Sequence, residues 1–139
     1  MAKIMAKIRK ILVDADALVA LAKVDDSNHK KALKIAKKLK KDTLFITPLT
    51  IPETATVISY RVSHNSAKVF LLDARKRNLV ELPLNLSEVN AADSIFLAQK
   101  RKGISWIDCL NVALIKINSF DGIFSFDKFY PKQGIKLIK

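Results

Sequence analysis

Short aliphatic runs alternate with longer amphipathic stretches along this chain, and each pattern predicts a different element. A continuous run such as Ile11-Leu12-Val13 is typical of a strand covered on both faces. Apolar residues that recur every three to four positions predict helices. Strands are expected over 8–13, 43–47, 79–82, 122–125 and, at an edge, 135–138, and helices over 17–22, 30–41, 51–61, 64–77, 87–102 and 105–117.

Strands that alternate with helices predict an α/β protein, here a three-layer α/β/α sandwich with a mostly parallel central sheet. The helix over 105–117 is apolar on all sides and is expected to be buried. In the helix over 64–77, Val69, Phe70 and Leu72 are expected to face the core.

Acidic residues follow these elements at places that a parallel sheet can bring together. Asp14 and Asp16 follow the first strand, and Asp127 follows the strand over 122–125. Glu53 and Asp108 lie in the first turns of two helices. Sites in open α/β sheets form outside the carboxyl ends of the strands, and clustered carboxylates suit Mg²⁺ or Mn²⁺. We therefore expect a divalent-cation site, with one or two ions.

Four of these acids, all but Asp14, also have a purely structural interpretation. Asp16 can cap the helix over 17–22, and an acid at the start of a helix such as Glu53 favours the helix dipole. Ser105 and Asp108 have the spacing of a capping box. An acid such as Asp127, between a strand and a turn, is common because its side chain can hydrogen-bond to the backbone of the turn. These interpretations stay open beside the metal-binding one.

Composition and charge narrow the class of partner. The chain has 139 residues, the size of one domain, with residues 1–7 expected as a loosely attached N-terminus. The formal net charge of +12 favours a polyanion, with RNA contacts expected from lysines of the helix over 30–41, namely Lys30, Lys34, Lys37, Lys38 and Lys41. No apolar run approaches the ~18 residues of a membrane span and no export signal is seen, so we expect a cytoplasmic protein without a membrane partner.

Four motifs in this order resemble the PIN-domain ribonucleases, and among them the small VapC-type toxins. They are Ile11 to Leu21, Ile51-Pro52-Glu53, Gly103 to Leu110, and Ser125-Phe126-Asp127-Lys128-Phe129. The resemblance covers nearly the whole chain. It implies metal-dependent endonucleolytic cleavage of RNA by a water nucleophile, a homodimer and a cognate antitoxin, with Asp14, Glu53, Asp108 and Asp127 as the metal-binding, catalytic acids and Ser125 as a supporting residue. Asn111, the other polar residue near Asp108 in the apolar helix over 105–117, is expected to support the site as well.

Two departures from the family pattern bear on the site. Asp16 stands where the family usually has Ser, Thr or Asn, so it is a candidate additional ligand or a cap. Ser125 stands where Thr is common, which keeps the hydroxyl group. Two other functions stay open: an RNA-binding or interaction module that has lost catalysis, and a haloacid-dehalogenase-like phosphatase with Asp14 as its nucleophile.

Overall fold

The computed structural model describes residues 7–139, so most of the expected loose N-terminus lies outside the described residues. Lys7, the first described residue, pairs with Asp121, with 3.1 Å between Nζ and Oδ1. The elements are β1 (Lys10–Val13), α1 (Ala15–Ala22), α2 (His29–Lys38), β2 (Thr43–Ile46), α3 (Thr50–Arg61), α4 (His64–Ala74), β3 (Val80–Glu81), α5 (Leu86–Ala98), α6 (Trp106–Asn118), β4 (Gly122–Phe124) and α7 (Phe129–Lys132).

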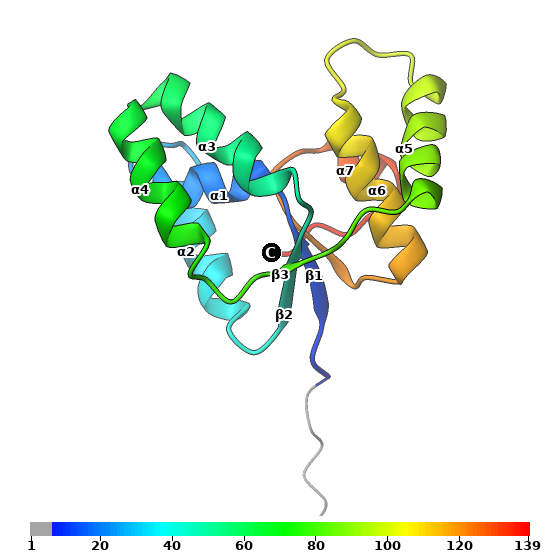
Figure 1. The fold of residues 1–139 in the computed structure, drawn as a ribbon. Helices are drawn as coiled ribbons and strands as arrows, with labels where there is room; N and C mark the ends of the chain where they lie inside the picture. The colour runs from blue at the N-terminus through cyan, green and yellow to red at the C-terminus, as the bar shows by residue number, and fades with distance from the viewer. Residues whose placement is uncertain (1–6) are drawn as a thin grey trace, which may run out of the picture.

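The four strands form one parallel sheet in the order β3-β2-β1-β4. Helices cover both faces, with α1 to α4 on one side and α5 to α7 on the other, which is the expected α/β/α sandwich (Figure 1). Because all strands run in the same direction, their carboxyl ends lie at one edge of the sheet. Asp14 follows β1, which lies in the middle of the sheet, and its backbone N–H continues the ladder to the carbonyl of Phe124 at 3.0 Å.

Strand β1 is apolar throughout its buried part because both of its faces are covered. Ile11 and Val13 belong to the core beside α1 and α2, whereas Leu12 packs into a second core with Val112 of α6 and Phe129 of α7. Side chains of a strand alternate between faces, so consecutive aliphatic residues are needed to fill both cores. None of the helices in residues 7–139 is long and apolar enough to cross a membrane.

Several predicted boundaries are wrong at the carboxyl ends of helices. The helix expected over 30–41 ends at Lys38, and the one expected over 87–102 spans Leu86–Ala98. Asn85 caps α5 through a capping box with Glu88, so the helix begins one residue before the predicted start. The chain then runs for seven residues, through Gly103, to the Ser105 cap of α6.

Two expected core residues of α4 lie on the surface. Val69 and Leu72 are 68% and 65% exposed, and only Phe70 packs against the core. Ile117, near the end of the otherwise buried α6, is half exposed as well. Four consecutive apolar residues, Val69-Phe70-Leu71-Leu72, lie in the middle of α4, so its periodicity does not distinguish an inner face from an outer one.

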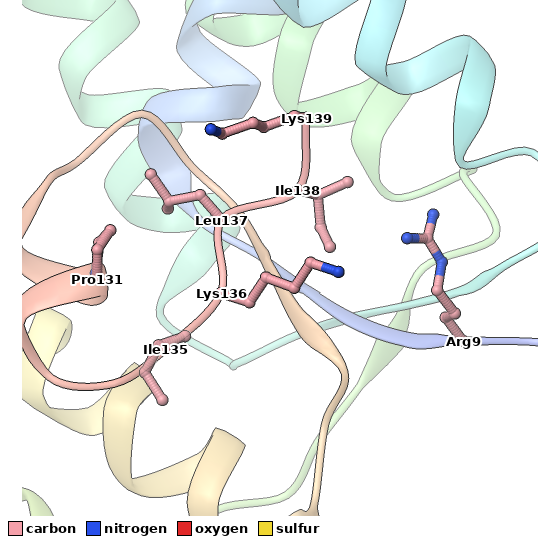
Figure 2. A pocket seen from close by; sticks show the side chains of 7 residues that line it. All are labelled: Arg9, Pro131, Ile135, Lys136, Leu137, Ile138 and Lys139. Carbon is pink, nitrogen blue, oxygen red and sulfur yellow. The ribbon is translucent and has the colours of Figure 1, made fainter.

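The C-terminal segment forms a single parallel bridge, between Ile123 and Leu137, instead of the expected edge strand. Beside it lies a hollow of about 570 Å³, lined by Arg9, Pro131, Ile135, Lys136, Leu137, Ile138 and Lys139 (Figure 2). Its lining combines cationic and aliphatic side chains and holds no acidic side chain.

Candidate metal centre

Asp14 is the most buried acid of the site, with 6% of its surface exposed. Its Oδ1 accepts hydrogen bonds from the backbone N–H of Ala15 at 2.8 Å and from Asn111 Nδ2 at 3.3 Å. Its Oδ2 accepts from the hydroxyls of Ser125 at 3.0 Å and Tyr130 at 2.9 Å. The Ala15 contact makes Asp14 the N-cap of α1.

Asp16 is therefore not the cap of α1, and the structural role predicted for it is wrong. It lies in the first turn of α1, and its Oδ2 accepts from Ser125 Oγ at 3.0 Å and from the backbone N–H of Phe126 at 2.9 Å. Its other oxygen, Oδ1, is buried and has no hydrogen-bond partner. The extra acid thus joins α1 to the chain that follows β4 and leaves one buried oxygen free.

Asp108 reaches the site from the first turn of α6. The predicted capping box is present: the Asp108 N–H donates to Ser105 Oγ at 3.0 Å, and the Ser105 N–H donates back to Asp108 Oδ2 at 3.4 Å. The other oxygen, Oδ1, accepts from the Tyr130 hydroxyl at 3.1 Å. Tyr130 thus lies between Asp14 and Asp108.

Glu53 and Asp127 complete the acidic group. Glu53 lies in the first turn of α3, half-buried, and its Oε2 is a buried oxygen without a hydrogen-bond partner. Asp127 accepts from the N–H of Phe129 at 2.9 Å, which is the predicted turn role, while its own N–H donates to Ser125 Oγ at 3.1 Å.

The acids are close enough to perturb one another. Burial, followed by repulsion from Asp16 and Asp108, raises the pKa of Asp14 to about 8. Burial is also the main cause of the raised pKa values of Asp16, Glu53 and Asp108, and neighbouring carboxylates add to each. For Glu53 those neighbours are Asp108 and Asp16. The electrostatics therefore place all four acids in one mutually repulsive group, and Asp127 contributes to the repulsion at Asp16 and Asp108.

The donor set fits a hard divalent cation. It consists of carboxylate oxygens, which Mg²⁺ and Mn²⁺ prefer, and two of them, Asp16 Oδ1 and Glu53 Oε2, are buried without a partner. Within residues 7–139, however, no three Asp, Glu, His or Cys side chains form a ready-made metal site. The reason is visible in the contacts: the hydroxyls of Ser125 and Tyr130 stand between the carboxylates and occupy Asp14 Oδ2.

Tyr130 was absent from the residues predicted for the site. It lies in α7, a four-residue helix too short to have a periodic pattern. Burial, together with the charges of Asp14 and Asp108, raises the pKa of its hydroxyl, so the hydroxyl keeps its hydrogen. The residue's position three places after Asp127 is the one signal in the sequence that could have drawn attention to it.

The lysines predicted to contact RNA are exposed, four on α2 and Lys41 in the turn after it, but most of them lie away from the acids. Lys37, Lys38 and Lys41 precede the start of β2, at the sheet edge opposite to the one that Asp14 occupies. A second basic group, Lys100-Arg101-Lys102, is exposed in the connection that leads to Ser105 and Asp108. This loop adjoins the amino-terminal end of α6, so it lies at the same edge of the fold as the acids (Figure 1).

Comparison with known proteins decides the family. The sequence profile of the PIN domain matches residues 11–134, which is most of the chain. The chain belongs to the PIN domain family. Its membership confirms the resemblance expected from the four motifs and supports a nuclease function. A search of curated proteins finds no match.

Two solved structures share this PIN fold. Mycobacterium tuberculosis VapC20, described as a sarcin-ricin loop cleaving toxin, superposes with a TM-score of 0.82 at 17% identity, over 91% of this chain and 96% of that one. VapBC2 from Rickettsia felis, bound to a DNA fragment from its promoter, superposes with a TM-score of 0.65 at 11% identity, over 94% and 97% of the two chains. At these identities the likeness establishes the α/β/α fold.

Proposed function

We propose that this PIN domain is a Mg²⁺- or Mn²⁺-dependent endoribonuclease and the toxin of a toxin–antitoxin pair. The observation that carries the proposal is the convergence of Asp14, Asp16, Glu53 and Asp108 at the carboxyl edge of the sheet, where the charges of Asp16 and Asp108 raise the pKa values of both Asp14 and Glu53. A repulsive group of buried carboxylates is unfavourable by itself and favourable around a cation.

Asp14, Glu53, Asp108 and Asp127 would hold the cation, with Asp16 as a fifth candidate. A cation bound there would activate a water and neutralise charge on the phosphate under attack. The chain's own residues hold these acids in place. Ser125 fixes Asp14 and Asp16 through one hydroxyl group, and Asn111 fixes the other oxygen of Asp14.

The basic surface supports a nucleic-acid substrate. A net charge of +12 attracts a polyanion over distances comparable with the Debye length. Lys100, Arg101 and Lys102 are placed to bind phosphates beside the acids, and the lysines of α2 extend the electrostatic attraction over a second face.

The comparisons support the toxin role and its partners. VapC20 is described as cleaving a structured RNA, the sarcin-ricin loop, and VapBC2 is a complex bound to promoter DNA. By analogy, we propose that this chain forms a homodimer, is inhibited by a cognate antitoxin and acts in the cytoplasm.

The test is a cleavage assay on structured and unstructured RNAs with Mg²⁺, with Mn²⁺ or with EDTA. Asp14→Asn and Asp108→Asn are expected to lower cleavage at least about a hundredfold, because each removes a charged ligand. Asp73→Asn is the matched control, since Asp73 is an exposed carboxylate on α4. If both site variants cleave as well as the parent, the assignment of the metal ligands is wrong.

The same assay separates the two alternatives. RNA binding without cation-dependent cleavage would favour a module that has lost catalysis. A phosphatase mechanism needs a free Asp14 oxygen as the nucleophile, whereas both oxygens of Asp14 accept two hydrogen bonds each. Phosphorylation of Asp14 by a small phosphoester would favour the phosphatase in spite of this arrangement.

A further inference from the structure

Every lone-pair position of Asp14 faces a hydrogen-bond donor. A carboxylate offers about four lone-pair positions on its two oxygens. Ala15 and Asn111 donate to Oδ1. Oδ2 faces the hydroxyls of Tyr130 and Ser125, and the single hydrogen of Ser125 also has Asp16 Oδ2 within reach at 3.0 Å. A cation can therefore bind Asp14 only if one of these four donors turns away.

Tyr130 is a donor that can turn away without losing its partner. Asn111 Nδ2 donates to the Tyr130 oxygen at 3.0 Å, so this oxygen acts as an acceptor there. Its single hydrogen has two carboxylates within reach, Asp14 Oδ2 at 2.9 Å and Asp108 Oδ1 at 3.1 Å. One hydrogen cannot satisfy both acceptors, so the hydroxyl has two alternative orientations.

The side chain around this hydroxyl is held firmly. Tyr130 is completely buried, and its ring packs edge-on against Phe129 with 5.7 Å between the ring centroids. The ring therefore stays in place while the hydroxyl hydrogen rotates. This arrangement differs from a surface tyrosine such as Tyr60, which is 88% exposed.

We propose that Tyr130 is a positioning residue that holds Asp14 against Asp108 in the metal-free protein and releases Asp14 to a divalent cation by turning its hydroxyl hydrogen to Asp108. The inference rests on the proposed metal-dependent function. The hydroxyl takes the place of the cation between two carboxylates that repel each other, and it keeps them at a fixed separation until a cation arrives.

The hydroxyl contributes more before the cation binds than afterwards. At a pH above the pKa of Asp14, the hydroxyl of the metal-free protein donates to a charged carboxylate, and such hydrogen bonds are stronger than those to neutral acceptors. With metal, the charge on both Asp14 and Asp108 is largely neutralised. Removing the hydroxyl therefore destabilises the metal-free form more than the metal-bound form.

The test is Tyr130→Phe, which conserves the buried ring and removes only the hydroxyl. Titration with MnCl₂ in a calorimeter is expected to give a Kd about three- to tenfold lower than that of the parent, the equivalent of one ordinary hydrogen bond. The Tm of the variant is expected to be lower than the parent's without metal, and the difference should narrow at saturating Mn²⁺. Tyr60→Phe is the matched control and should change neither quantity.

The outcomes separate this inference from the proposed function. An equal loss of Tm with and without Mn²⁺ and an unchanged Kd would show that Tyr130 is only structural. A higher Kd would show that the hydroxyl orients the metal-bound site; either result overturns the inference while the metal-dependent function stands. A parent protein that binds neither Mn²⁺ nor Mg²⁺ overturns both.

Discussion

Raising the pH is expected to destabilise the metal-free protein, because the folded site holds protons that the unfolded chain gives up. The pKa of Asp14 rises from 3.8 to about 8 on folding, through burial and through repulsion from Asp16 and Asp108. Between these two pH values the folded state binds more protons than the unfolded state, so the free energy of unfolding falls as the pH rises. The effect is complete once the pH exceeds the pKa of the folded state.

The size of the effect follows from the same values. Each pKa unit corresponds to about 1.4 kcal/mol, so Asp14 alone would give an upper bound of about 6 kcal/mol. Water entry and relaxation around a newly formed buried charge reduce this penalty. We expect a loss of about 2 to 3 kcal/mol between about pH 5 and about pH 8.5, or a fall in Tm of about 6 to 12 °C for a domain of this size.

Urea unfolding in EDTA measures this loss directly. Trp106, the single tryptophan, is half-buried beside the site, and its indole N–H donates to Asp93 at 2.8 Å, so its fluorescence reports unfolding. Asp14→Asn is expected to flatten the pH dependence, and saturating Mg²⁺ should flatten it in the parent. Asp73→Asn, which removes an exposed carboxylate on α4, should keep the parent's slope. A metal-free parent whose stability is constant or rises over this pH range would refute the idea that burial and repulsion raise the pKa of Asp14 in the folded protein.

Three further predictions concern other parts of the molecule. Ser125→Ala should lower the free energy of unfolding by about 1 to 3 kcal/mol, because two carboxylates and the Asp127 N–H lose their hydrogen-bond partner. Ser125→Thr should restore the free energy of unfolding if the added methyl group fits; urea unfolding measures both variants. Gly122→Ala should lower the Tm, because a Cβ there would come within 2.7 Å of the Ile138 side chain and 2.8 Å of the Lys136 carbonyl oxygen and would push the C-terminal segment off β4. A triple variant of the loop before α6, with Lys100→Gln, Arg101→Gln and Lys102→Gln, should bind RNA more weakly than a triple variant of α2 with Lys34→Gln, Lys37→Gln and Lys38→Gln, which removes the same charge. Fluorescence anisotropy over a range of salt concentrations measures the difference in RNA binding.

The sequence predicts the sheet and its acids because both depend on local patterns. An aliphatic run that stops at Asp14 indicates a buried strand with an acid at its carboxyl end, and the Ser105–Asp108 spacing indicates a capped helix start. These signals need no knowledge of distant contacts. The same reasoning offers Asp16 as a candidate cap of α1, because a cap and a first-turn acid differ by only two residues and both suit the helix dipole.

What the sequence could not predict depends on how distant segments meet. The contact of Tyr130 with Asp14 joins positions 116 residues apart, and it follows from the way the chain turns back after β4 into a short α7. The exposure of Val69 and Leu72 likewise depends on which face of α4 packs against α3, and a helix with apolar residues on all sides does not reveal this.

The arrangement of the acids links the stability of the fold to its proposed chemistry. Asp16 Oδ1 and Glu53 Oε2 are buried without partners, and leaving such an oxygen unsatisfied costs about 1 to 3 kcal/mol or more. A fold selected for stability alone would replace one of them with a neutral or smaller side chain. Instead, the hydroxyls of Ser125 and Tyr130 and the amide of Asn111 partly offset the repulsion around Asp14, while one buried oxygen of Asp16 and one of Glu53 stay without a partner. The unsatisfied oxygens and the repulsion between carboxylates thus lie where a bound cation would offset them. Added metal is therefore expected to stabilise this domain most at high pH, where the carboxylates are charged.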